Sequence, residues 1–219
     1  MLCTITNSCS FQSYYLLIVL FKQIVNKIYV KKKKIYALKR IRSLTDERVT
    51  LMAYHALFDS LIRFGIVAWG MGNQKDLENI LICQKKAIRI INKLNNREHC
   101  KPFFKKNKIL TLISLYIYET ILLTKKVPVK TRETFHDHNL RNKNNLNLKQ
   151  HHLQKTNKTP IYMGSKLYNL LPQNIKSIKT VTLFEKTLKQ YLVDRPYYSI
   201  QEFYDEHTFT NHRDIDIFT

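Results

Sequence analysis

The chain has 219 residues, 44% of them hydrophobic, and carries 37 Lys and Arg against 16 Asp and Glu, a net charge of +21. Only four glycines and five prolines occur, which argues against a loop-rich β sandwich and favours an all-α fold, a small helical bundle. Residues 1–193 hold 35 basic and 10 acidic side chains (net +25), whereas residues 194–219 hold 2 and 6 (net −4). The strong positive charge of residues 1–193 predicts a polyanionic partner, most of all nucleic acid.

Residues 1–34 form an apolar and basic segment that we cannot place in a domain. Its apolar run, Tyr14 to Phe21, is too short to cross a bilayer, and no basic residue precedes it as in a signal peptide. We therefore expect a buried or interfacial helix and no stable membrane insertion, with a short anchor as the alternative. The run Lys31, Lys32, Lys33 and Lys34 is either solvated or a patch for phosphate contact or nuclear import. No CxxC pair occurs, so a reducing compartment, nuclear or cytoplasmic, is expected.

Two amphipathic helices are predicted first. One covers 46–64, with Thr45 as its N-cap and an apolar face of Val49, Met52, Ala53, Ala56, Leu57 and Phe64. The other covers 73–94, with an apolar stripe of Leu77, Ile80, Leu81, Ile88 and Ile91 and a buried thiol at Cys83. Trp69 lies between them in the sequence and is predicted to be a core anchor, with stacking on bases as the alternative.

Short helices are expected at 102–107 and 111–124, which completes a helical domain over 35–127. Residues 128–159 are rich in Asn, Lys, His and Thr and are predicted to be a polar linker. Helical periodicity returns at 160–171 and at 182–193, where Phe184, Leu188, Tyr191 and Leu192 share a face. A C-terminal helical extension, 160–205, is expected to end in a partly disordered acidic tail, 206–219.

The sequence offers no convincing catalytic centre. It contains no Asp-Asp pair to place two metal ions, no phosphate-binding G-x-x-x-x-G-K-[ST] loop and no G-x-S-x-G elbow. His136, His138, His151 and His152 lack the spacing of zinc ligands and are expected to be surface residues. We therefore predict no catalytic residue, no metal and no cofactor.

One face of the second helix is the best candidate site. With Lys85 at zero, Arg89 lies near ~40°, Lys93 near ~80° and Lys86 near ~100°, whereas the apolar stripe centres near ~270°. These four cations, with no acid among them, are predicted to contact phosphates, and the alternative is an ordinary solvated face. Ile82, near ~60° on the same scale, is an apolar misfit.

Five segments resemble, in order, the region that follows the palm in LINE-type, jockey-like non-LTR retrotransposon reverse transcriptases. The segments are YHALFDSLIRFGIVAWG (54–70), QKKAIRII (84–91), HCKPFFKKNKILTLISLYIYE (99–119), PIYMGSKLYNLLPQNIK (160–176) and FEKTLKQYL (184–192). The resemblance covers roughly residues 35 to 205. The palm motifs with their catalytic aspartates and the endonuclease domain have no counterpart, the block around 138–143 is shortened, and residues 1–30 match nothing in the family.

The resemblance implies a thumb-like domain with a C-terminal extension that contacts RNA or an RNA/DNA hybrid beside the palm. It implies no catalytic residue in this chain, and a separate palm-containing polypeptide as a further partner. Two alternatives remain open: a decayed retroelement fragment without a function, and a host-adopted helical protein-interaction module.

Overall fold

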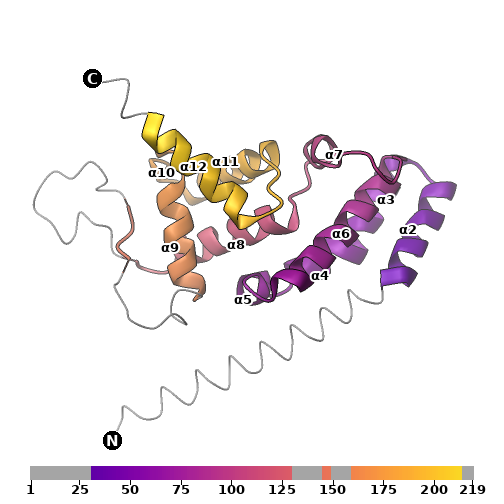
Figure 1. The fold of residues 1–219 in the computed structure, drawn as a ribbon, viewed down its shortest axis with the longest axis horizontal. Coiled ribbons are helices and arrows are strands. Elements are labelled where there is room, and N and C mark those ends of the chain that lie inside the picture. The colour runs from indigo at the N-terminus through magenta and orange to yellow at the C-terminus, as the bar shows by residue number, and fades with distance from the viewer. Residues whose placement is uncertain (1–30, 130–144, 149–158, 214–219) are drawn as a thin grey trace, which may run out of the picture. The chain divides into compact units, whose positions relative to one another are not determined.

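The computed structural model describes residues 31–129, 145–148 and 159–213 (Figure 1). These residues form helices and, within those ranges, no strand, so the predicted all-α fold is confirmed. The chain divides into two compact units, one ending at Phe103 and the other starting at Phe104. The helix expected at 111–124 therefore belongs to the second unit, not to the unit formed by the helices before it.

The first unit contains a long helix, a series of short helices and a second long helix. These are α2 (Lys31–Leu44), α3 (Glu47–Tyr54), the π-helical turn η1 (His55–Asp59), α4 (Ser60–Arg63), α5 (Ile66–Trp69) and α6 (Gln74–Ile91). α2 packs against α3 and α6, and α3 also contacts α6. The buried amide of Gln84 on α6 donates to the hydroxyl of Tyr54 on α3 at 3.0 Å, which satisfies two polar groups inside this core.

The first predicted helix forms, but two details of it were wrong. Its N-cap is Asp46, not Thr45, because the Asp46 carboxylate accepts from the Val49 amide at 2.9 Å. The predicted apolar face is largely in solvent: Val49 is 44% exposed, Met52 59% and Phe64 62%. The buried face is Thr50, Tyr54, Phe58 and Ile62 instead. In η1 the amide of Ser60 reaches the carbonyl of His55, five residues back, and this wider turn brings residues spaced by four onto one side.

The second predicted helix is confirmed with a shorter C-terminal end. α6 starts after Asn73, whose side chain accepts from the Lys75 amide at 3.1 Å, and ends at Ile91 rather than at residue 94. Its predicted stripe is buried throughout, and so is Cys83. The stripe therefore supplies one side of the core of the first unit.

The second unit is built around α8 (Leu112–Lys126), which is buried nearly all round. α9 (Pro160–Leu170) and α11 (Val181–Asp194) pack on it, α10 (Gln173–Lys176) contacts α11, and α12 (Ile200–Arg213) contacts α9. α7 (Lys101–Lys106) leads from the first unit into this one. Gly164 allows the closest approach of α8 and α9, because a Cβ there would lie 2.6 Å from the Thr120 carbonyl oxygen and would overlap Thr124 Oγ1.

The acidic tail is the larger correction to the sequence prediction. Residues up to 213 form α12, and Tyr197, Phe203 and His207 are buried. Glu206 accepts from the Tyr197 hydroxyl at 2.6 Å and pairs with Arg195 at 2.9 Å, so part of the tail's negative charge is used inside the unit. Only residues 214–219 of the predicted tail lie outside the described residues.

Most of the predicted linker, 130–144 and 149–158, lies outside the described residues. The described piece, 145–148, is held by α9 and α10. Asn169 both donates to the Leu146 carbonyl, at 2.9 Å, and accepts from the Leu146 amide, at 2.7 Å. Lys176 is only 8% exposed and donates to Asn145 Oδ1 at 3.0 Å and to the Asn169 carbonyl at 2.6 Å. Burial lowers the pKa of Lys176 to about 8.

Candidate nucleic-acid interface

A groove between α2 and α6 gathers a set of cations in the first unit. Its volume is about 470 Å³. Five of the ten residues that line it are basic and none is acidic; the basic residues are Lys39, Arg42, Lys86, Arg89 and Lys93. Within the described part of the chain, none of these five forms an ion pair with a carboxylate. The groove therefore carries a positive charge that no carboxylate of the described residues neutralises by a direct ion pair.

The two arginines are half-buried and fixed by backbone carbonyls. Arg42 Nε donates to the carbonyl of Ile91 at 2.8 Å, and its NH1 group donates to the carbonyl of Thr45 at 3.1 Å. Ile91 is the last residue of α6, so Arg42 satisfies one of the free carbonyls at the negative end of that helix. Arg89 donates through its NH2 group to the Glu98 carbonyl at 3.1 Å. These bonds hold both guanidinium groups without cancelling their charge.

The three lysines are exposed, and one of them has an unusual backbone. Lys93 has φ 54°, in the left-handed region. The Leu94 amide bonds to the Arg89 carbonyl at 2.9 Å and the Lys93 amide to the Ile90 carbonyl at 3.2 Å. This is the Schellman arrangement that ends a helix, with lysine at the position where glycine is preferred. The turn places Lys93 at the mouth of the groove, beside Leu94 and Asn96.

The structure brings together three of the four residues predicted on the second helix. Lys86, Arg89 and Lys93 line the groove, whereas Lys85 does not. Lys93 reaches the groove from the turn after α6, so the predicted helical angle does not apply to it. The face is only partly open to solvent: Lys86 and Lys93 are exposed, whereas Lys85 and Arg89 are half-buried.

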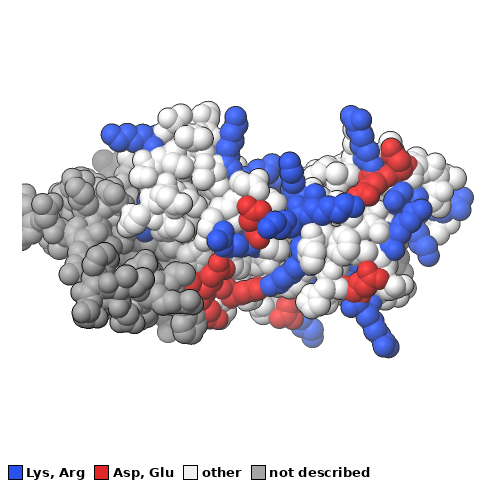
Figure 2. Space-filling model, turned by 90° about the horizontal axis from the view of Figure 1, so that it is seen from above, with Lys and Arg blue, Asp and Glu red and all other residues white. Residues whose placement is uncertain are grey.

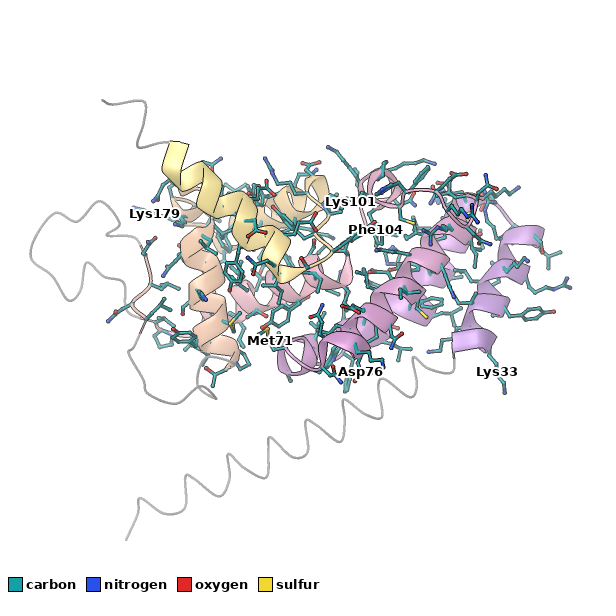
Figure 3. All side chains as sticks on the ribbon, viewed as in Figure 1. Lys33, Met71, Asp76, Lys101, Phe104 and Lys179 are labelled. Atoms are coloured by element: carbon teal, nitrogen blue, oxygen red, sulfur yellow. The ribbon has the colours of Figure 1, made fainter. Side chains whose placement is uncertain are left out.

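The run of four lysines begins α2, and neither Lys33 nor Lys34 lines the groove. Lys33 is exposed (Figure 3), and Lys34 Nζ donates to the Leu57 carbonyl at 3.4 Å. Lys31 and Lys32 are the first two residues of the helix. Within residues 33–44, the cations that join the site are Lys39 and Arg42, one helical turn apart.

Lys39 and Arg42 were not singled out from the sequence. The signal was present, since residues 22–42 hold nine basic residues and no acid, and the spacing of three puts these two on one side of a helix. What the sequence did not show is that this side turns toward α6. Figure 2 shows the wider setting, in which Lys and Arg side chains project from the described surface with fewer Asp and Glu among them.

Trp69 is 4% exposed, and its indole nitrogen donates to the Phe64 carbonyl at 2.8 Å. Its ring is therefore enclosed and not presented to a base. Ile82, the predicted misfit, is 48% exposed.

Within the described ranges, no cluster of three or more His, Cys, Asp or Glu side chains is arranged to hold a metal ion. His136, His138, His151 and His152 lie outside those ranges. No described helix combines the length and apolarity needed to cross a bilayer.

Comparisons with models of known protein families, with curated proteins and with solved structures find no match to this chain. The groove therefore has to be interpreted from its own chemistry.

Proposed function

We propose that this chain binds nucleic acid through the α2–α6 groove, as the C-terminal part of a LINE-type RNA-directed DNA polymerase that lacks the catalytic palm. The observation that carries the proposal is the convergence of five cations, four from α2 and α6 and one from the turn after α6, with no acid among the lining residues. Bringing like charges together costs free energy, which a polyanion would recover. The five ordered segments that resemble the retrotransposon family support the same proposal from the sequence.

The partners that fit are RNA or an RNA/DNA hybrid, and a palm, which these 219 residues do not contain, would have to supply any polymerase chemistry. Phosphoryl transfer needs carboxylates that place two metal ions. The sequence has no adjacent aspartate pair, and the proposed role is to hold nucleic acid.

The test compares two variants that lose the same charge. Lys39→Gln, Lys86→Gln and Lys93→Asn together remove the three exposed lysines of the groove, and Asn at 93 tolerates the left-handed backbone. The matched control is Lys179→Gln, Lys186→Gln and Lys189→Gln, three exposed lysines of the second unit; Lys179 is labelled in Figure 3.

Binding of a labelled oligonucleotide is measured by fluorescence anisotropy as a function of salt. The groove variant should bind more weakly and should flatten the log–log salt dependence by about 2, whereas the control should change little. Equal losses in both variants would mean that binding follows net charge alone and that the groove is only a solvated surface.

The exposed apolar side chains of the first unit favour a second candidate, a helical protein-interaction module. Met52 and Phe64 are 59% and 62% exposed, and Val49 is on the same side of α3 as Met52. Apolar groups gathered on one helix face mark many protein contacts. Association of the chain that is insensitive to salt and lost in Met52→Glu, with no binding of nucleic acid, would favour this candidate over the groove.

A decayed fragment with no function is the third candidate. Its prediction is the absence of a cooperative unfolding transition, because relaxed selection tolerates core lesions. Each unit has its own buried core in the structure, so we expect a cooperative transition in urea.

A further inference from the structure

We infer that the α2–α6 groove holds one strand of nucleic acid by its phosphates, without regard to base sequence, and binds a single strand in preference to a duplex. The inference rests on the proposed function and names the form of nucleic acid that the site accepts.

Independence from base sequence follows from what lines the groove. Besides the five cations, the lining consists of Ile35, Ser43, Ile90, Leu94 and Asn96. None of the ten residues is aromatic, so no ring is offered for stacking on a base. Ser43 and Asn96 are the only uncharged polar side chains of the lining, and the arginines, which can also bond guanine edges, are held in place by backbone carbonyls. Contacts to phosphates would dominate, and these carry no sequence information.

The preference for a single strand follows from where the cations lie. A-form RNA duplexes have a deep, narrow major groove that side chains cannot read, so a protein contacts them over the phosphates and the wide, shallow minor groove on their outer surface. Here the two helices pack against each other, and Arg42 of α2 donates to the last carbonyl of α6. The two arginines are half-buried in the cleft between the helices. A duplex presents its phosphates on the outside of a rigid cylinder, so it can meet the exposed lysines but cannot bend into the cleft to reach both arginines.

The arginines are also prepared for a phosphate. A guanidinium has five N–H donors in a fixed plane. Arg42 uses its Nε and NH1 groups on carbonyls, and Arg89 uses its NH2 group, so each retains donors for an anion. Because the carbonyls already fix both side chains, little rotamer entropy is lost on binding. The apolar part of the lining, Ile35, Ile90 and Leu94, suits the sugar and base edges of a flexible strand.

The experiment uses the full chain and four probes of about 20 nucleotides: single-stranded U-only and A-only RNA, an RNA duplex and an RNA/DNA hybrid. Affinities are compared at equal phosphate concentration and several salt concentrations. We expect each single strand to bind roughly tenfold or more tightly than either duplex, and the two homopolymers to agree within about threefold. Arg89→Lys, which keeps the charge but loses the planar fork, should reduce single-strand affinity more than duplex affinity.

Each contrary result has a distinct meaning. A duplex that binds as tightly as the single strands would overturn the inference and leave the proposed function standing. A difference of more than about tenfold between the homopolymers would overturn independence from sequence. The variant with Lys39, Lys86 and Lys93 replaced distinguishes failure of this inference from failure of the proposed function. Unchanged affinity for every probe would overturn the proposed function itself. All three of these lysines are exposed, so this variant keeps the test independent of whether Arg89→Lys folds.

Discussion

Replacing Gly164 by alanine tests the close contact between α8 and α9. The new Cβ would lie 2.6 Å from the Thr120 carbonyl oxygen, about 0.8 Å inside an ordinary contact, and would overlap Thr124 Oγ1. The carbonyl belongs to the buried backbone of α8 and cannot rotate away, so α9 must move. Overpacking of this kind costs about 3 kcal/mol, and the better helix propensity of alanine returns about 1 kcal/mol. We therefore expect a net loss of about 2 kcal/mol in the free energy of unfolding.

Urea unfolding followed by far-UV circular dichroism measures this loss as a lower midpoint with an unchanged slope. A partial rescue adds a second check. Thr124→Ala in the Gly164→Ala background removes the Oγ1 overlap but leaves the clash with the Thr120 carbonyl, so the two substitutions should couple by about 1 kcal/mol. A Gly164→Ala protein as stable as the parent, or more stable, would show that α8 and α9 do not approach as described.

Four further predictions concern the anchor, the groove, a buried lysine and catalysis. Trp69→Ala should lower the free energy of unfolding by roughly 3–5 kcal/mol in urea; a neutral result would indicate an exposed ring. Lys93→Gly should raise it by roughly 0.5–1 kcal/mol, by relieving the left-handed backbone, and should weaken oligonucleotide binding in the same preparation. Because the folded pKa of Lys176 is about 8 against an ordinary 10.5, the unfolded chain binds more protons between these values. The free energy of unfolding of the parent chain, relative to that of Lys176→Met, should therefore rise from about pH 8 to about pH 10.5. Parallel pH profiles of the two proteins would contradict this. Finally, primer extension on an RNA template with Mg²⁺ or Mn²⁺ should not exceed a heat-killed control; extension above it would refute the absence of polymerase chemistry.

The sequence predicted best those helices whose apolar residues form a single stripe. Leu77, Ile80 and Ile88 of α6 are buried as expected, because the opposite face is mainly charged and offers Ile82 as a lone apolar residue that stays exposed. α3 carries apolar residues on two faces, and the periodicity selected Val49 and Met52, which are exposed. A pattern of hydrophobic residues cannot decide between two such faces, because the choice depends on which face α6 meets.

α12 was missed for a different reason. Its buried residues are aromatic and imidazole side chains rather than aliphatic ones. His207 is 3% exposed, with Nδ1 2.7 Å from the Phe203 carbonyl and Nε2 2.8 Å from the Tyr191 hydroxyl. A carbonyl only accepts, so Nδ1 donates, and the Tyr191 hydroxyl donates to Nε2. When the hydrogen-bond partners of a segment are distant in the sequence, the sequence alone predicts a polar, disordered segment.

Three of the five cations of the candidate site, Lys86, Arg89 and Lys93, could be predicted from the sequence. Lys86 and Arg89 follow from the period of one helix, because residues three apart share a side. Lys39 and Arg42 belong to another helix, and their position beside α6 depends on packing over some fifty residues of chain. The Arg42 bond to the Ile91 carbonyl spans 49 positions, and no local pattern contains it.

The π-helical turn at His55–Asp59 contains one residue more than an α-helix would need to bring Tyr54 and Ile62 onto the same side. Eight residues separate Tyr54 from Ile62, which would be about 800° in an α-helix, some 80° past two full turns. Seven residues would give about 700°, within about 20° of two turns. A protein lacking the exposed Ala56 should thus close the gap as an unbroken α-helix and still bury both ends of the segment. The cost would fall on Phe58 alone, the one buried residue inside the turn.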